Sequence, residues 1–199
     1  LRPYGDGGPI VMNCEAFEAY YEAQGREWER YAMIKARPVA GDIEAGNQLL
    51  ERLRPFVYRR YFDYGTFDSL RDMKARITEQ IKSGHFKSNI KLGEGGIREI
   101  EFFGQIFQMI RGGLEPDLQQ RSLLKILTAL SEHGVINPET CSALTDAYVF
   151  LRRLENRLQA YADLQTHDLP EPGPYLDMMA LAMGYPTAPD LIRALNGHM

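Results

Sequence analysis

The feature that most constrains the fold is a long amphipathic segment over about residues 138–164. It opens with Asn137-Pro138, where the asparagine side chain can accept a hydrogen bond from a free N–H of the first helical turn and proline suits that turn. Apolar residues then recur every three or four positions, which is the spacing of one helix face. They are Leu144, Ala147, Leu151, Leu154, Leu158 and Tyr161. The pattern predicts one long helix.

Helical periodicity continues through most of the remaining chain. Asn13 is placed to cap a helix that extends to about residue 36 and that Gly25 kinks or divides. Further helices are predicted before Pro55, from Thr66 to Gly84, over 97–111, from Leu123 to Gly134, and as two short segments within 170–199. A single strand is predicted at 10–12, after a glycine-rich turn. The sequence therefore predicts a mainly α chain, a helical bundle with a short strand-containing remnant of an α/β domain at the N-terminus.

Charge and composition narrow the classes of partner. The formal net charge is −4, so neither nucleic acid nor an acidic membrane surface is expected as a partner. No apolar run approaches the ~20 residues of a membrane span. Cys14 and Cys141 lie far apart in the chain and are expected to be reduced thiols of a cytoplasmic protein. The histidines show no metal-ligand spacing, and no metal site is predicted from His85, His133, His167 and His198.

A glycine-rich turn over residues 91–96 leads directly into the helix predicted at 97–111. Free N–H groups and the positive end of the helix dipole suit a phosphate at such a place. Lys91 and Arg98 flank the turn and are placed to add charged hydrogen bonds to phosphate oxygens. The turn is not a Walker A motif, because no Gly-Lys-Ser or Gly-Lys-Thr ends it. A phosphate site and a tight structural turn are both compatible with this pattern.

The helix after this turn has an apolar and a polar stripe. The apolar stripe consists of Ile97, Ile100, Phe103, Phe107 and Ile110, and the polar stripe of Arg98, Glu101, Gln105 and Gln108. Because the four polar residues lie three or four positions apart, they stack along one side of the helix. A solvated helix face and the wall of a wet cleft both explain such a stripe, and the sequence leaves the two open.

Two further groups of charges have alternative explanations. Lys35 and Arg37 end the first helical stretch, where they would either point towards a nucleotide or interact favourably with the helix C-terminus. A second group lies on the long helix, and charge runs of this kind are typical of a surface. Its members are Arg152, Arg153, Glu155, Asn156 and Arg157.

Several segments together resemble the glutamine synthetase adenylyltransferase family. They are Leu1-Arg2-Pro3 followed by Gly-Asp-Gly-Gly-Pro, 28–37, 54–61, Lys91-Leu-Gly-Glu-Gly-Gly-Ile-Arg-Glu-Ile-Glu-Phe, and 150–156. This family joins two related nucleotidyltransferase halves: one attaches AMP from ATP to a tyrosine of glutamine synthetase, and the other removes it with phosphate, releasing ADP. The resemblance at Arg98-Glu99 and at residues 24–28 favours the N-terminal, adenylyl-removing half.

The resemblance implies a division into domains and a set of cofactors. Residues 1–41 would be the C-terminal end of the nucleotidyltransferase domain, and 42–199 the helical domain that follows it. The family's metal-binding aspartates would precede Leu1, so no catalytic residue is expected in the covered chain. Mg²⁺, ATP or ADP and phosphate would be bound by the intact enzyme. We expect the chain to be a piece of a longer protein and inactive alone.

The resemblance also implies site residues and partners. Phosphate or nucleotide would be contacted by Lys91, Gly95, Gly96, Arg98, Glu101, Gln105, Lys35 and Arg37. Glutamine synthetase would be the substrate protein, the PII signalling protein a partner, and glutamine an effector. Two alternatives stay open. One is a non-catalytic helical module that docks glutamine synthetase or PII. The other is the ATP-dependent adenylylating half, or a relative of the PII uridylyltransferases.

Overall fold

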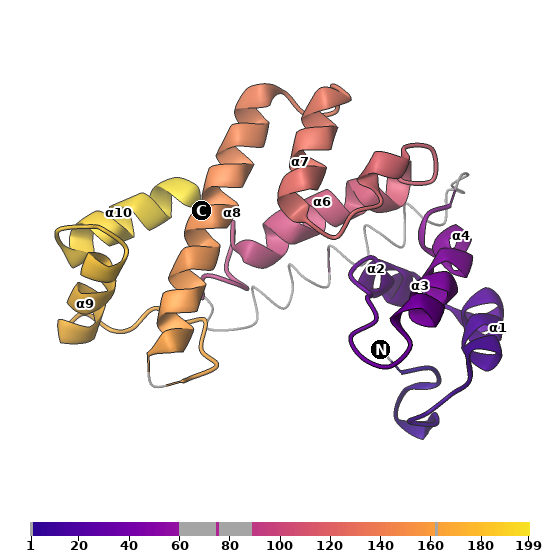
Figure 1. The fold of residues 1–199 in the computed structure, drawn as a ribbon. Coiled ribbons are helices and arrows are strands. Elements are labelled where there is room, and N and C mark those ends of the chain that lie inside the picture. Colours follow the sequence, from indigo (N-terminus) through magenta and orange to yellow (C-terminus); the bar gives the residue numbers. More distant parts are fainter. Residues whose placement is uncertain (1, 60–74, 76–88, 162) are drawn as a thin grey trace. The chain divides into compact units, whose positions relative to one another are not determined.

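The computed structural model describes residues 2–59, 75, 89–161 and 163–199, and within them the chain is built from helices (Figure 1). The α-helices are α1 (Cys14–Gln24), α2 (Glu27–Met33), α3 (Ile43–Arg52), α4 (Arg54–Val57), α6 (Ile97–Arg111), α7 (Leu123–Glu132), α8 (Pro138–Ala160), α9 (Pro174–Ala182) and α10 (Ala188–His198). Two short 3-10 turns, η1 (Gly5–Gly7) and η3 (Pro116–Leu118), accompany them. The predicted mainly α class is confirmed.

The strand predicted at residues 10–12 is wrong. This segment forms bends and irregular backbone, and Ile10 and Val11 are 88% and 85% exposed. A strand needs a neighbouring strand to satisfy its backbone groups, and the described residues contain no strand, only an isolated bridge between Asn89 and Asp168. The α/β remnant expected at the N-terminus is therefore not seen in the described part of the chain.

Local signals placed most helix ends correctly. Asn13 caps α1 by accepting a hydrogen bond from the Ala16 N–H at 2.7 Å, and Asn137 caps α8 by accepting one from the Thr140 N–H at 2.7 Å. Gly25 follows the last residue of α1 and separates it from α2, as predicted. Gly134 ends the segment after α7 with a φ of 68°, a conformation that favours glycine.

Three predicted helix ends need correction, and one predicted helix lies outside the described residues. The helical stretch predicted to reach about residue 36 ends at Met33, the last residue of α2. Pro55 was expected to stop a helix, but it lies in the first turn of α4, where a missing N–H costs nothing. The helix α8 ends at Ala160, about one turn before the predicted end. The helix predicted from Thr66 to Gly84 falls on residues that, apart from Ala75, are not among those described.

The chain divides into two compact units, which are taken separately. The first comprises residues 1–74 and 105–126, and the second comprises 75–104 and 127–199. The core of the first unit consists of Tyr20, Tyr21, Met33, Ile34, Leu53, Val57 and Met109. In the second unit α10 packs on both α8 and α9. The domain boundary predicted at residue 41 was inferred from the family resemblance, whereas these two units are defined by contacts within the chain. The predicted boundary therefore stays a prediction.

The long helix α8 is the centre of the second unit. Four residues of its predicted apolar stripe are buried: Ala147, Leu151, Leu154 and Leu158. Tyr161, the last residue of that stripe, is 46% exposed and stacks on Tyr175 with ring centroids 4.0 Å apart. The apolar face therefore anchors α8 in its unit and leaves the other faces for polar side chains.

Candidate functional site

The glycine turn before α6 uses its backbone donors internally. Asn89 Oδ1 accepts hydrogen bonds from the N–H groups of Lys91 and Leu92 at 3.1 and 2.8 Å. The Gly95 N–H donates to Glu99 Oε2 at 2.8 Å. Further internal bonds join the N–H groups of Gly93, Gly96, Ile97, Arg98 and Glu99 to carbonyl oxygens within residues 89–96. The backbone thus has the structure of a tight turn, and an anion at this helix start would be held by side chains.

Both predicted glycines of this turn sit where a side chain would collide. Gly95 has a φ of +71°, and a Cβ atom there would lie 2.3 Å from the Met199 carbonyl oxygen. A Cβ atom on Gly96 would lie 2.8 Å from the carbonyl oxygens of Gly93 and Ile90. These contacts give the two glycines a packing role, while their predicted contact with phosphate stays a prediction.

Lys91 is paired with a buried carboxylate on α8. Its Nζ lies 3.3 Å from Glu155 Oε1, and Glu155 is only 2% exposed. The same carboxylate lies 2.6 Å from an Arg152 guanidinium nitrogen and 3.1 Å from His167 Nδ1. The surface interpretation of the α8 charges is therefore wrong for Glu155, because three cationic or polar partners let its carboxylate be buried. The phosphate contact predicted for Lys91 stays a prediction.

The polar stripe of α6 divides into an exposed and a buried part. Arg98 is exposed, and Glu101 accepts a hydrogen bond from the Tyr148 hydroxyl at 3.1 Å. Burial first, and then the charge of Glu101, raises the pKa of Tyr148 to about 12, so at neutral pH the hydroxyl is a donor. Gln105 and Gln108 are 5% and 0% exposed. The solvated-face interpretation is therefore wrong for these two glutamines.

Gln108 stabilises the fold through side-chain hydrogen bonds that its position in the polar stripe did not predict. Its side-chain amide donates to the Leu118 carbonyl at 2.7 Å and to the Gln120 carbonyl at 2.6 Å. These bonds hold the η3 turn against α6, because buried carbonyl groups need a donor. For the buried Gln105, the predicted contact with nucleotide or substrate stays a prediction.

In the first unit, Lys35 and Arg37 line one cleft. The cleft has a volume of about 490 Å³ and apolar walls that include Phe17 and Leu49. Lys35 Nζ donates to the Arg121 carbonyl at 2.6 Å, and Arg37 is exposed. Two cations beside an apolar wall are compatible with a phosphate-bearing ligand, as predicted for this pair.

A buried charge group in α2 was not found from the sequence. Arg30 is 0% exposed, and a guanidinium nitrogen lies 2.9 Å from Glu27 Oε2. The neighbouring Glu29 accepts hydrogen bonds from the Tyr20 hydroxyl and the Arg26 N–H, both at 3.0 Å. Burial first, and then the bond to Glu29, raises the pKa of Tyr20. The sequence signal was present, since Glu27 and Arg30 lie one helical turn apart within an aromatic segment.

No group of three or more histidine, cysteine, aspartate or glutamate side chains within the described residues is placed to hold a metal ion. Among the same residues, no helix is long and apolar enough to cross a membrane.

Two protein-family models match this chain. Residues 71–199 match a family model described as GlnD PII-uridylyltransferase, and residues 1–52 match one described as glutamate-ammonia ligase adenylyltransferase. The first model covers more than half of the chain, which therefore belongs to the GlnD PII-uridylyltransferase family.

Curated relatives that align with the whole chain carry a different name. They are bifunctional glutamine synthetase adenylyltransferase/adenylyl-removing enzymes, with 54% identity for that of Nitrosococcus oceani, 52% for Xanthomonas campestris pv. campestris (strain B100) and 51% for Thioalkalivibrio sulfidiphilus. Each alignment covers 100% of this chain and 20–21% of the relative, so the chain spans about a fifth of their length. The resemblance to adenylyltransferases of glutamine synthetase is thereby confirmed, and the assignment to the adenylyl-removing half stays a prediction.

The two sets of matches overlap over residues 71–199. The same helical segment thus aligns with the uridylyltransferase model and with the curated adenylyltransferases. The model's name alone therefore does not select one of the two chemistries for this chain.

Proposed function

We propose that this chain is part of an enzyme that controls glutamine synthetase by reversible adenylylation of a tyrosine, within the half that removes AMP by phosphorolysis. The observation that carries the proposal is 51–54% identity over the whole chain to enzymes named for both activities. Glutamine synthetase is then the substrate protein, and PII and glutamine are the regulators that the resemblance implies.

The assignment to the removing half rests on short segments. The sequence Gly95-Gly96-Ile97-Arg98-Glu99 at the start of α6 and residues 24–28 before and within α2 resemble that half. The structure is compatible with a binding role at the first segment, because the Arg98 side chain is exposed at the first turn of α6.

The family resemblance implies that the aspartates that bind Mg²⁺ in the proposed enzyme precede Leu1. The reaction itself is a displacement at the AMP phosphorus, in which phosphate attacks, the tyrosine oxygen leaves, and ADP is released. The guanidinium of Arg98 would bind oxygens of the incoming phosphate or of the adenylyl group. Fixed cations at such oxygens lower the barrier by neutralising charge without reorganisation.

Substitution of Arg98 by alanine in the intact enzyme tests the proposal. A charged hydrogen bond contributes about 1.5–3 kcal/mol, so Arg98→Ala should slow ADP release from adenylylated glutamine synthetase roughly ten- to a hundredfold. Adenylylation with ATP should keep its rate. Arg193→Ala is a matched control, because its side chain is 79% exposed and pairs only locally with Asp190.

Two outcomes would overturn the assignment. Loss of ATP-dependent adenylylation with intact ADP release would place the chain in the adenylylating half. Parental rates of both reactions would remove Arg98 from the site, and the resemblance at the start of α6 would no longer support the removing half.

A further inference from the structure

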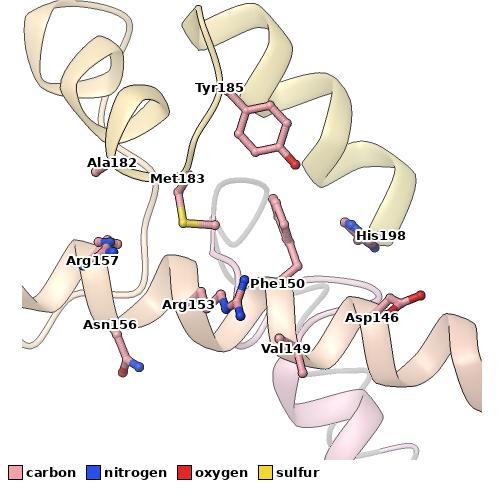
Figure 2. Close-up of a pocket in the computed structure, with 10 residues that line it drawn as sticks. All are labelled: Asp146, Val149, Phe150, Arg153, Asn156, Arg157, Ala182, Met183, Tyr185 and His198. Carbon is pink, nitrogen blue, oxygen red and sulfur yellow. The ribbon is translucent and has the colours of Figure 1, made fainter.

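A cleft in the second unit lies between α8 and the segment that links α9 to α10. It has a volume of about 840 Å³, within the usual range of small-molecule pockets. Figure 2 shows Arg153 and Arg157 on the side of α8 that faces Ala182 and Met183, with the ring of Phe150 beside them. None of the residues proposed above for adenylyl removal lines this cleft.

The two arginines make one wall of the cleft positive. The contacts of the described residues give these charges no role in stabilising the fold. Arg153 and Arg157 lie one turn apart on α8 and are exposed, and like charges at this spacing destabilise a helix. The adjacent carboxylate of Glu155 is buried and already contacts Arg152, so it does not neutralise them. Within the described residues the structure gives neither guanidinium an ion pair. An external anion would supply the missing charge.

Asp146 is the one carboxylate among the lining residues, and it lies towards the far end of the cleft from Arg157. Its Oδ2 accepts a hydrogen bond from the Ser142 hydroxyl at 3.5 Å. In Figure 2 its carboxylate points away from the two guanidinium groups. The half of the cleft that holds Arg153 and Arg157 therefore stays positive.

The opposite part of the cleft is aromatic. The Phe150 ring packs on His198 with centroids 4.6 Å apart and meets Tyr185 edge to face at 6.2 Å. Figure 2 shows the Phe150 ring rising from α8 towards the Tyr185 ring, with Met183 to one side of both. Rings from α8, from the α9–α10 link and from the end of α10 thus form one surface on which a flat heterocycle can stack.

Two neighbouring guanidinium groups beside an aromatic wall suit a ligand with a phosphate at one end and a flat ring at the other. From this geometry we infer that the cleft binds a nucleoside phosphate, with its phosphate on Arg153 and Arg157 and its base against Phe150, His198 and Tyr185. Inorganic phosphate would use only the arginines. An uncharged nucleoside would use only the rings.

Photolabelling of the intact protein with 8-azido-AMP, followed by mass spectrometric mapping, tests this inference. We expect labelled peptides within 146–161 or 182–198, and protection by unlabelled AMP. The double variant Arg153→Gln/Arg157→Gln should lower labelling at these peptides by roughly tenfold or more, since two charged hydrogen bonds are lost. Arg193→Gln on α10 should label like the parent, because Arg193 does not line the cleft.

The competitors decide the ligand class. AMP should protect at much lower concentration than inorganic phosphate, and His198→Ala should weaken protection by AMP but not by phosphate. Equal protection by AMP and phosphate would overturn the nucleoside class. No labelling within these peptides, or labelling of these peptides that survives the double substitution, would overturn the site. Circular dichroism of each variant separates loss of binding from loss of fold.

Discussion

The Lys91 ammonium lies 3.3 Å from the Glu155 carboxylate, and this contact joins the glycine turn before α6 to the buried side of α8. A second connection lies nearby, because the Asn89 amide donates to Asp168 Oδ1 at 2.8 Å and the Ile90 N–H donates to the His167 carbonyl at 2.9 Å. The turn is thus fixed on both sides by residues distant in sequence. Its rigidity would orient the first residues of α6, including Arg98.

Replacing the buried carboxylate should destabilise the second unit. Glu155→Gln keeps the shape but removes the charge that Lys91, Arg152 and His167 face. Lys91 and Arg152 are partly exposed, so water can solvate them when the carboxylate charge is removed. We therefore expect the free energy of unfolding to fall by about 1–3 kcal/mol, which is less than the cost of breaking a fully buried ion pair. Lys91→Met should cost less, since Glu155 keeps two partners. Urea unfolding checks both values, and a larger loss for Lys91→Met would contradict this order.

Alanine substitutions at three glycines distinguish the cost of a left-handed backbone conformation from the cost of a steric clash. Gly134→Ala places a side chain at a φ of +68° with open space around it, so it should cost about 1 kcal/mol. Gly95→Ala has the same conformation but also meets the Met199 carbonyl oxygen, so it should cost clearly more. Gly197→Ala lies within α10 with nothing close, and should stabilise by about 0.5–1 kcal/mol. Thermal unfolding of the three variants measures this ranking, and equal costs at 95 and 134 would remove the steric argument.

Gln108 provides a test of the buried polar contact in the first unit. Gln108→Leu keeps the volume but leaves the carbonyls of Leu118 and Gln120 without their donor. An unsatisfied buried polar group costs about 1–3 kcal/mol, and the unfolding free energy should fall by that amount. Gln48→Leu is the matched control, because Gln48 is exposed on α3 and donates only to Glu44 at 3.2 Å. Hydrogen exchange at residues 116–120 should accelerate in the first variant and not in the second.

The helix starts were predictable because capping is local. Asn13 and Asn137 bond within their own first turns, so the sequence contains the whole interaction. The pairing of Lys91 with Glu155 was not predictable, because it depends on how α8 lies against a distant turn. The false strand at residues 10–12 has the same origin, since strand formation needs a partner that local pattern does not specify.

The sequence named candidate site residues but not how they are arranged, and their role in binding stays a prediction. The sequence indicated that Lys35 and Arg37 act together, and both line one cleft of the first unit. It did not indicate that the amides of the glycine turn are consumed internally, because Asn89 lies just before the glycine motif and looks like an ordinary loop residue. Burial of Gln105 and Gln108 also depends on tertiary packing that periodicity cannot supply.

The bond between Tyr148 and Glu101 makes stability depend on pH in the alkaline range. Burial and the Glu101 charge raise the pKa of the folded hydroxyl from 10.0 to about 12. The neutral hydroxyl is therefore favoured in the folded state. Its contribution is complete below pH 10, the ionisation range of the unfolded tyrosine, and is lost as the pH rises towards 12.

Tyr148→Phe isolates this contribution, because Tyr21 and Tyr58, whose pKa values burial also raises to about 12, are present in both proteins. Between pH 9 and pH 11 the free energy of unfolding of the parent should fall by roughly 1 kcal/mol relative to that of the variant. This value includes a reduction for solvent screening at the half-buried hydroxyl. Urea midpoints at the two pH values measure the difference. Since ionisation would place two negative charges at the ends of one 3.1 Å contact, a difference that stays constant with pH would mean that Tyr148 is solvated and not bonded to Glu101.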